Sequence, residues 1–304
     1  MFYNSNCIEL LEYLIIFRKD NMKGNCALYG LESDLKNSHI IPKFVFDYLK
    51  STGSKYMRTY EEPNKRVQDG PKEYLLCEKA EQDFSRRERW FANNIFFPYL
   101  KKEKTTFEYD ENFAYFMISV LWRVLIDQNK HPSVMTDEKL DFLKDVQNEW
   151  KLFLSNFQFP INFNDLNIFV TDRVESHNTE GVNVDLYFSR VIDATIITDN
   201  DYKTVAVYVK FLRFMIWSVV KGNPNDCKDV KIKFSKGVLK LPQELKDTFF
   251  GGFVQNRIRE IDSRPKATED QQLKIAKEIK KNEKEFWESD AGKSMLNDYK
   301  NAKF

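Results

Sequence analysis

The sequence predicts an α+β fold, in which helices come first and an antiparallel sheet follows. Before residue 160 apolar side chains recur every three or four positions, whereas β-branched and aromatic runs dominate residues 167–241. The chain has 304 residues, of which 42% are apolar and 15% aromatic, and it contains only 10 glycines. This composition excludes low-complexity and largely disordered chains, and the length suits one large domain or two smaller ones.

The first third of the chain should alternate short strands with helices. Pro42 separates the first strand from the first helix, and Gly53 and Pro98 should end the two helices. In chain order we expect a strand at 38–41, a helix at 43–51, a loop or hairpin at 53–72, a strand at 73–76 and a helix at 79–100.

The middle of the chain predicts two further helices and then the sheet. In chain order we expect helices at 109–129 and 136–158 and strands at 167–171, 184–188, 194–198 and 204–217. Asn200-Asp201 marks a hairpin turn between two of these strands. Ser235-Lys236-Gly237 marks another, between short strands at 230–234 and 238–241.

The composition changes again near Gln255, where long charged runs replace large apolar side chains. Residues 262–304 predict either a solvated helical tail or a helix that binds a partner. The predicted organisation is an N-terminal extension at 1–21, a first unit at 22–108, a helical and sheet domain at 109–254 and a charged helical tail at 255–304.

The chain carries no sign of export or of a membrane. It contains no run of about 20 apolar residues, so we expect no spanning helix. Met1–Asn21 lacks a basic start and a small-residue cleavage site, which argues against a signal peptide and leaves Met1 or Met22 as the natural start. The 4 cysteines are far apart, so we expect a reducing, cytoplasmic location and no disulfide framework.

One ordered set of residues in the first third carries chemical information. Cys26 lies at a tight turn, Ser38-His39-Ile40-Ile41-Pro42 follows, and Leu75-Leu76-Cys77 then opens a helix with Glu81 one turn later. This order, over residues 22–100, resembles the treble-clef, HNH-like family. The Ser-His-Ile-Ile-Pro and Leu-Leu-Cys-x-x-x-Glu motifs look like those of a group of HNH-like bacterial proteins.

The family holds one zinc ion with two Cys-x-x-Cys pairs. Cys26 and Cys77 match the first cysteine of each pair, but Tyr29 and Ala80 stand where the second cysteines belong. Two thiolates do not complete a tetrahedral site, so we expect no zinc and a degenerate treble clef held by apolar packing. The alternative is a zinc site that a ligand distant in sequence completes.

In the nucleases of this family a His activates water, and a second residue holds a divalent ion on the scissile phosphate. The resemblance assigns the base to His39 and offers Glu81 and Glu88, on the following helix, as ligands for Mg²⁺ or Mn²⁺. Ser38 stands where an acidic or His ligand usually precedes the base. His39 as a structural, hydrogen-bonding residue therefore stays open beside His39 as a general base.

The segment around this motif is basic, although the 47 Lys and Arg of the whole chain balance its 46 Asp and Glu. Residues 36–104 hold 15 Lys and Arg against 10 Asp and Glu. Basic side chains contact phosphates, and Tyr56, Tyr60 and Trp90 could stack on bases. The predicted nucleic-acid ligands are Arg58, Asn64, Lys65, Arg66, Arg86 and Arg87. The alternative is an ordinary solvated loop and helix face.

With the resemblance, these residues predict a protein that binds DNA or RNA without strong catalysis, in a microbial role such as anti-phage defence. Two alternatives stay open. One is a metal-dependent endonuclease with His39 as base, and the other is a protein-interaction or homo-oligomerisation module that uses the charged tail. No cofactor is expected beyond Mg²⁺ or Mn²⁺ in the nuclease case, and no Walker loop or dinucleotide fingerprint indicates another class.

Overall fold

The computed structural model describes residues 22–157, 165–175, 183–222, 228–246 and 248–301, and the expected extension at 1–21 lies outside them. The fold is α+β, as predicted, and its sheets are antiparallel. The strands are β1 (Met22–Asn25), β2 (Glu32–His39), β3 (Lys72–Cys77), β4 (Thr106–Tyr109), β5 (Leu166–Val170), β6 (Ile192–Thr198), β7 (Val205–Phe211), β8 (Phe214–Lys221) and β9 (Gly237–Lys240). The helices are α2 (Lys43–Ser51), α3 (Glu78–Phe91), the π-helical η1 (Ala92–Phe96), α4 (Phe97–Leu100), α5 (Glu111–Gln128), α6 (Pro132–Met135), η2 (Glu138–Leu140), α7 (Leu143–Asn156), α8 (Val184–Arg190), η3 (Lys228–Val230), α9 (Thr248–Ser263), α10 (Glu269–Lys281), α11 (Glu283–Glu288) and α12 (Asp290–Asn301).

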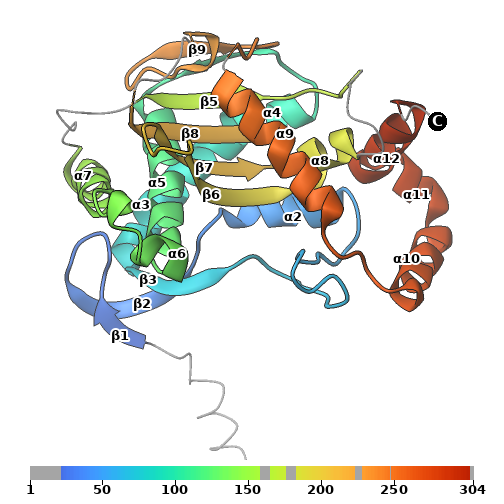
Figure 1. Cartoon of the computed structure of the whole chain (residues 1–304), viewed down its shortest axis with the longest axis horizontal. Helices are drawn as coiled ribbons and strands as arrows, with labels where there is room; N and C mark the ends of the chain where they lie inside the picture. Colours follow the sequence, from blue (N-terminus) through green and yellow to red (C-terminus); the bar gives the residue numbers. More distant parts are fainter. Residues whose placement is uncertain (1–21, 158–164, 176–182, 223–227, 247, 302–304) are drawn as a thin grey trace, which may run out of the picture.

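The central sheet has the strand order β5-β8-β7-β6. Side chains of β7 alternate between two cores: Val207 and Val209 pack with α5, whereas Ala206 and Tyr208 pack with Phe250 of α9. Successive side chains of a strand point to opposite faces, so a sheet covered on both faces is apolar at nearly every position. Figure 1 shows the resulting layers, with α9 crossing one face of the sheet and α5 behind the other.

The predicted strand at 204–217 is a hairpin of two strands rather than one. β7 and β8 pair antiparallel and turn at Leu212, whose φ of 52° lies in the left-handed region. A turn is usually marked in sequence by Gly, Asn or Asp, and this one carries none of them. The hairpin turn predicted at Asn200-Asp201, between β6 and β7, is confirmed.

The predicted strand at 184–188 is wrong, because this segment is helix α8. The carboxylate of Asp298 accepts hydrogen bonds from the backbone N–H groups of Asp185 and Leu186, both at 2.8 Å. At the other end, the fully buried ammonium of Lys210 donates to three backbone carbonyls of the last turn. Both ends are therefore capped by residues distant in sequence, and these contacts override the local preference for a strand.

The predicted hairpin around residues 235–237 is also wrong. β9 pairs with β4, while Lys231 forms an isolated bridge with Asn167 of the central sheet. Gly237 permits the pairing, because a Cβ atom there would lie 2.2 Å from the hydroxyl oxygen of Tyr109. The glycine therefore marks close packing of an aromatic ring and not a turn.

The predicted helix at 79–100 is confirmed, because α3 continues through η1 into α4, which ends at Leu100. Pro98, which was expected to end this helix, lies two residues before its end, just after the π-helical η1.

The charged tail folds back on the body of the protein. α12 packs against α8 and buries Ser294 and Asp298 at the contact, and the N–H of Ala291 donates to the carbonyl of Thr52 at 3.1 Å. α10 and α11 bury no residue. Figure 1 shows α10, α11 and α12 beside the sheet, next to α8. None of the helices in the described ranges is long and apolar enough to cross a membrane.

Candidate functional site

Strands β2 and β3 and helix α3 form a ββα unit that carries the predicted site. His39 is the last residue of β2 and pairs in register with Lys72, the first residue of β3. The His39 ring stacks on Phe46 of α2, with ring centroids 6.1 Å apart. The side chain is therefore held against the core at the end of the strand pair.

His39 forms a pair with Asp69, a residue of the loop before β3. The Nε2 atom of His39 lies 2.9 Å from Oδ1 of Asp69. Burial opposes ionisation of Asp69, but hydrogen bonds from Lys72, His39 and the N–H of Gly70 outweigh it and hold the pKa of the carboxyl well below its usual range. The ionised Asp69 holds the His39 ring by Nε2, so Nδ1 is the ring nitrogen that does not contact Asp69. This arrangement suits a structural histidine and a general base equally well.

Arg123, from α5, joins His39 to α3. Its guanidinium donates to the backbone oxygen of His39 at 2.8 Å and to the carboxylate of Glu88 at 2.7 Å. The Arg123 side chain is 4% exposed. Glu88 is therefore close to the His39 strand end, as the resemblance implies, but its carboxylate is neutralised by an arginine.

Glu81 lies two helical turns before Glu88 on α3 and forms no hydrogen bond with His39 in the part of the chain that the structure describes. The structure thus brings His39 and Glu88 together and leaves Glu81 at the other end of the helix. Among the described residues, no three His, Cys, Asp or Glu side chains are grouped so that they could hold a metal ion.

The turn between β1 and β2, which we call the knuckle, places Cys26 beside Cys77. The N–H of Gly30, at φ 69°, donates to the carbonyl of Cys26 at 2.7 Å, and the N–H of Cys77 points at Sγ of Cys26 over 3.3 Å. Burial raises the pKa of the Cys26 thiol, but the N–H groups of Cys77, Tyr29 and Leu28 outweigh it and lower that pKa. Both cysteines are free thiols.

The two positions that lack cysteine are filled by other contacts. The hydroxyl of Tyr29 donates to Asp83 at 2.7 Å, and the ammonium of Lys79 lies 3.8 Å from the Tyr29 ring centroid. Ala80 and Leu76 are fully buried. A hydrogen bond, a cation–π contact and apolar packing therefore join the knuckle to α3.

The two predicted arginines of α3 have different surroundings. Arg86 is 68% exposed and lies 3.6 Å from Asp83. Arg87 is 11% exposed, packs 4.5 Å over the Tyr115 ring and donates to the carbonyl of Asp83. Arg86 is therefore accessible to a ligand, whereas Arg87 is part of the packing between α3 and α5.

The loop at 53–71 holds the other four predicted ligands, and two of them contact the tail. Asn64 accepts a hydrogen bond from the N–H of Thr268 at 2.9 Å, just before α10. Arg66 forms an ion pair with Glu278 of α10 and lies 4.5 Å over the Tyr56 ring. Lys65 pairs with Glu62 at 3.0 Å. Arg58 donates to the carbonyl of Pro63 at 3.0 Å.

Of the aromatic residues proposed for base stacking, Trp90 packs against the core, 6.2 Å from the ring of Phe113. Tyr56 lies under Arg66, and Tyr60 lines a cleft. Only Tyr60 therefore faces a space where a ligand could lie.

This cleft, of about 820 Å³, lies between the loop at 53–71, the end of α2, α8 with the start of β6, and α9 with the segment that follows it. Its apolar walls include Phe46, Met57 and Ile258. Asp69 also lines it, so the partner of His39 forms part of its wall. We call it the loop–α9 cleft.

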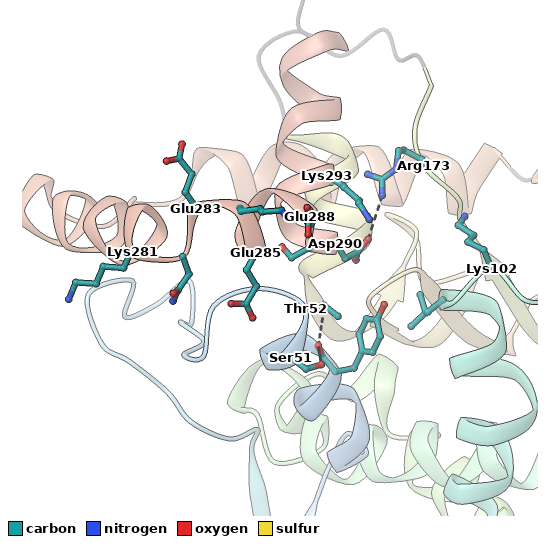
Figure 2. Close-up of a pocket in the computed structure, with 15 residues that line it drawn as sticks. Ser51, Thr52, Lys102, Arg173, Lys281, Glu283, Glu285, Glu288, Asp290 and Lys293 are labelled. Carbon is teal, nitrogen blue, oxygen red and sulfur yellow. Dashed lines mark hydrogen bonds and ion pairs between the residues drawn. The ribbon is translucent and has the colours of Figure 1, made fainter.

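A second cleft, of about 890 Å³, lies between the end of α2 and the helices α11 and α12. Figure 2 shows acidic and basic side chains together along it, with Asp290 directed toward Arg173. These two residues lie 3.5 Å apart, and Lys102 pairs with Asp172. Arg173 and Lys102, at this end of the cleft, are thus already paired with carboxylates.

Sequence reasoning missed three residues that shape the site. Arg123 lies within an apolar helical run, Arg190 lies in a segment expected to be a loop beyond a strand, and Asp69 was part of a polar turn without an assigned role. A charged residue inside a strongly apolar helix was the one available signal, because such a residue needs a buried partner.

No protein-family model, no curated protein and no solved structure matches the chain.

Proposed function

We propose that the chain binds nucleic acid through its HNH-like ββα unit and that Arg123 takes the place of a catalytic divalent ion there. The observation that carries the proposal is the position of the Arg123 guanidinium between the His39 carbonyl and the Glu88 carboxylate. A buried cation at this position leaves Glu88 no free charge for a metal ion. The site keeps the strand end and helix of a nuclease-like unit without its metal.

The outer face of α3 supports binding to phosphates. Gln82, Ser85, Arg86 and Arg89 are exposed and recur at helical spacing, so they form one polar, basic stripe. Arginine donates to phosphate oxygens in a forked geometry, and most protein–DNA hydrogen bonds go to the sugar-phosphate backbone. A role in anti-phage defence rests on the family resemblance alone.

The test is binding of labelled duplex DNA, single-stranded DNA and single-stranded RNA by fluorescence anisotropy at several salt concentrations. We expect the double variant Arg86→Gln/Arg89→Gln to bind more weakly and to lower the salt slope by about 2, since each phosphate contact contributes about 0.7–0.9. Lys144→Gln, on α7 and 70% exposed, is the matched control and should bind as wild type. Equal binding by both variants would remove the α3 stripe from the proposal.

A metal-dependent nuclease remains the second candidate, because the His39–Asp69 pair would also serve a general base. Cleavage of the same nucleic acids in Mg²⁺ or Mn²⁺, lost both with chelator and with His39→Ala, would favour it. Binding without cleavage, unchanged by His39→Ala, would favour the binding protein. Binding to none of the three nucleic acids would instead favour a protein interaction that depends on the tail.

A further inference from the structure

The charged groups that line the loop–α9 cleft are unequally paired. Each of its four carboxylates has a cationic partner: Asp69 has Lys72, Asp193 has Arg257, Glu61 has Arg264 and Asp262 has Lys266. Of its four arginines, Arg257 and Arg264 have carboxylate partners. Arg58 and Arg190 have none among the described residues.

The hydrogen bonds of Arg190 within the described residues all go to neutral oxygens, and the nearby carboxylate of Asp290 only partly offsets the effect of burial on the pKa of Arg190. Its guanidinium donates to the carbonyl and hydroxyl of Thr52, at 3.3 and 2.9 Å, and to the carbonyl of Leu49, so it caps the end of α2. Burial lowers the pKa of Arg190 to about 10. An arginine has five N–H donors, and these bonds leave Nε and one N–H of Nη2 without a partner among the described residues.

Arg58 has more free donors. It lines the cleft from the loop at 53–71, and it donates to the carbonyl of Pro63. A guanidinium inside a cleft with apolar walls is costly unless an anion neutralises it. Two such groups in one cleft match a ligand group that carries close to two negative charges.

We propose that the loop–α9 cleft binds a phosphomonoester, with Arg58 and Arg190 on the phosphate and the apolar wall on the organic body. A phosphomonoester carries about −1.5 to −2 charges at neutral pH, and planar guanidinium groups match its oxygens. The volume of about 820 Å³ lies in the range of small-ligand sites, and Phe46, Met57 and Ile258 provide an apolar surface for a base or another ring. This inference goes beyond the proposed function, because it does not need the α3 stripe.

A phosphomonoester can come from a free nucleotide or from the phosphorylated end of a nucleic acid. Four probes separate these sources: AMP, adenosine, and one oligonucleotide with either a 5′-phosphate or a 5′-hydroxyl. Calorimetric titration of the full chain should show that AMP binds and adenosine does not, or that the phosphorylated oligonucleotide binds more tightly than its hydroxyl form. Either preference supports the proposal and identifies the source.

The variants are Arg58→Gln and Arg190→Gln, with Lys55→Gln as the matched control. Lys55 is exposed on the same loop, has no ion-pair partner among the described residues and does not line the cleft. We expect each arginine variant to weaken phosphate-dependent binding about tenfold or more, and Lys55→Gln to leave it unchanged. Arg190→Gln removes the cap of α2 and could unfold the protein, whereas Arg58→Gln leaves that cap in place. Arg58→Gln therefore tests the proposal even if Arg190→Gln does not fold.

Two results would overturn the proposal. One is equal affinity for each phosphorylated probe and its unphosphorylated counterpart, and the other is wild-type affinity in Arg58→Gln. Loss of binding to the hydroxyl oligonucleotide in Arg86→Gln/Arg89→Gln concerns the α3 stripe only, so the two proposals can fail separately.

Discussion

The guanidinium of Arg123 donates to the backbone oxygen of His39 over 2.8 Å, and this contact fixes where the ββα unit meets the helical core. The same side chain reaches Glu88 on α3, so α5 holds the strand end and the outer helix at once. A single buried charge therefore positions two elements that the resemblance assigns to catalysis.

Replacing Arg123 with Met should destabilise the protein by about 3–5 kcal/mol, because the change leaves Glu88 as an unpaired charge in a partly buried place. Urea unfolding at neutral pH measures this loss. Arg123→Met/Glu88→Leu should recover part of it, since neither partner then remains unpaired. Arg86→Gln is the control and should change the stability by less than about 0.5 kcal/mol. An Arg123→Met loss no larger than that of Arg86→Gln would contradict the assigned role.

Asp69→Asn should lower the stability by about 0.5–1.5 kcal/mol at pH 7, because the charged hydrogen bonds to His39 and Lys72 weaken. The folded state depresses the pKa of Asp69, so its contribution is complete above the unfolded value near 4 and is lost as the pH falls below that value. The stability difference between wild type and variant in urea unfolding should therefore shrink steadily as the pH falls from about 4 toward the much lower folded pKa. A difference that stays constant as the pH falls from 4 to about 2 would contradict this account.

Chelator should leave the melting temperature of the purified protein unchanged. Tyr29 and Ala80 replace two ligands, and packing joins the knuckle to α3. A structural zinc would contribute on the order of 10 kcal/mol, so its removal would be obvious in a thermal scan. Elemental analysis of the same sample provides the check: one zinc per chain would mean that a distant ligand completes the site.

Glu278→Lys should release α10 from the loop at 53–71. The pair with Arg66 is exposed, so the change in global stability should stay below about 1 kcal/mol. Limited proteolysis between α9 and α10 is the more sensitive measurement, and cleavage should accelerate at low salt. The charge swap Arg66→Glu/Glu278→Arg should restore protection, while Lys274→Glu, exposed on the same helix, should cleave as wild type.

The predicted elements that matched the structure are those whose pattern is set locally. The helix at 111–128 and strands β5 and β6 of the central sheet followed from periodicity, because many of their side chains face a core. α8 failed because its two caps come from Lys210 and Asp298. A seven-residue helix that depends on such distant groups leaves no local signal.

In the candidate site, too, some residues could be named from a local motif and others could not. His39 and Glu88 could be named from the motif, since they lie at fixed positions in it. Their partners Asp69 and Arg123 lie 30 and 84 residues from His39, and no spacing in the sequence links them. The charge pairing in the loop–α9 cleft could likewise not be predicted from the sequence. Two of its four arginines lack a carboxylate partner, and which two depends on where the fold places each carboxylate.

The cap that Asp298 places on α8 also sets an order for biosynthesis. The backbone N–H of Asp185 donates to a carboxylate that lies 113 residues further along the chain. During translation the ribosome releases α8 and the central sheet well before α12, so the first turn of α8 must stay hydrated or frayed until the last helix emerges. A nascent chain interrupted before residue 290 should therefore hold a formed sheet beside an unfinished helix, and should be a better substrate for chaperones than the released protein.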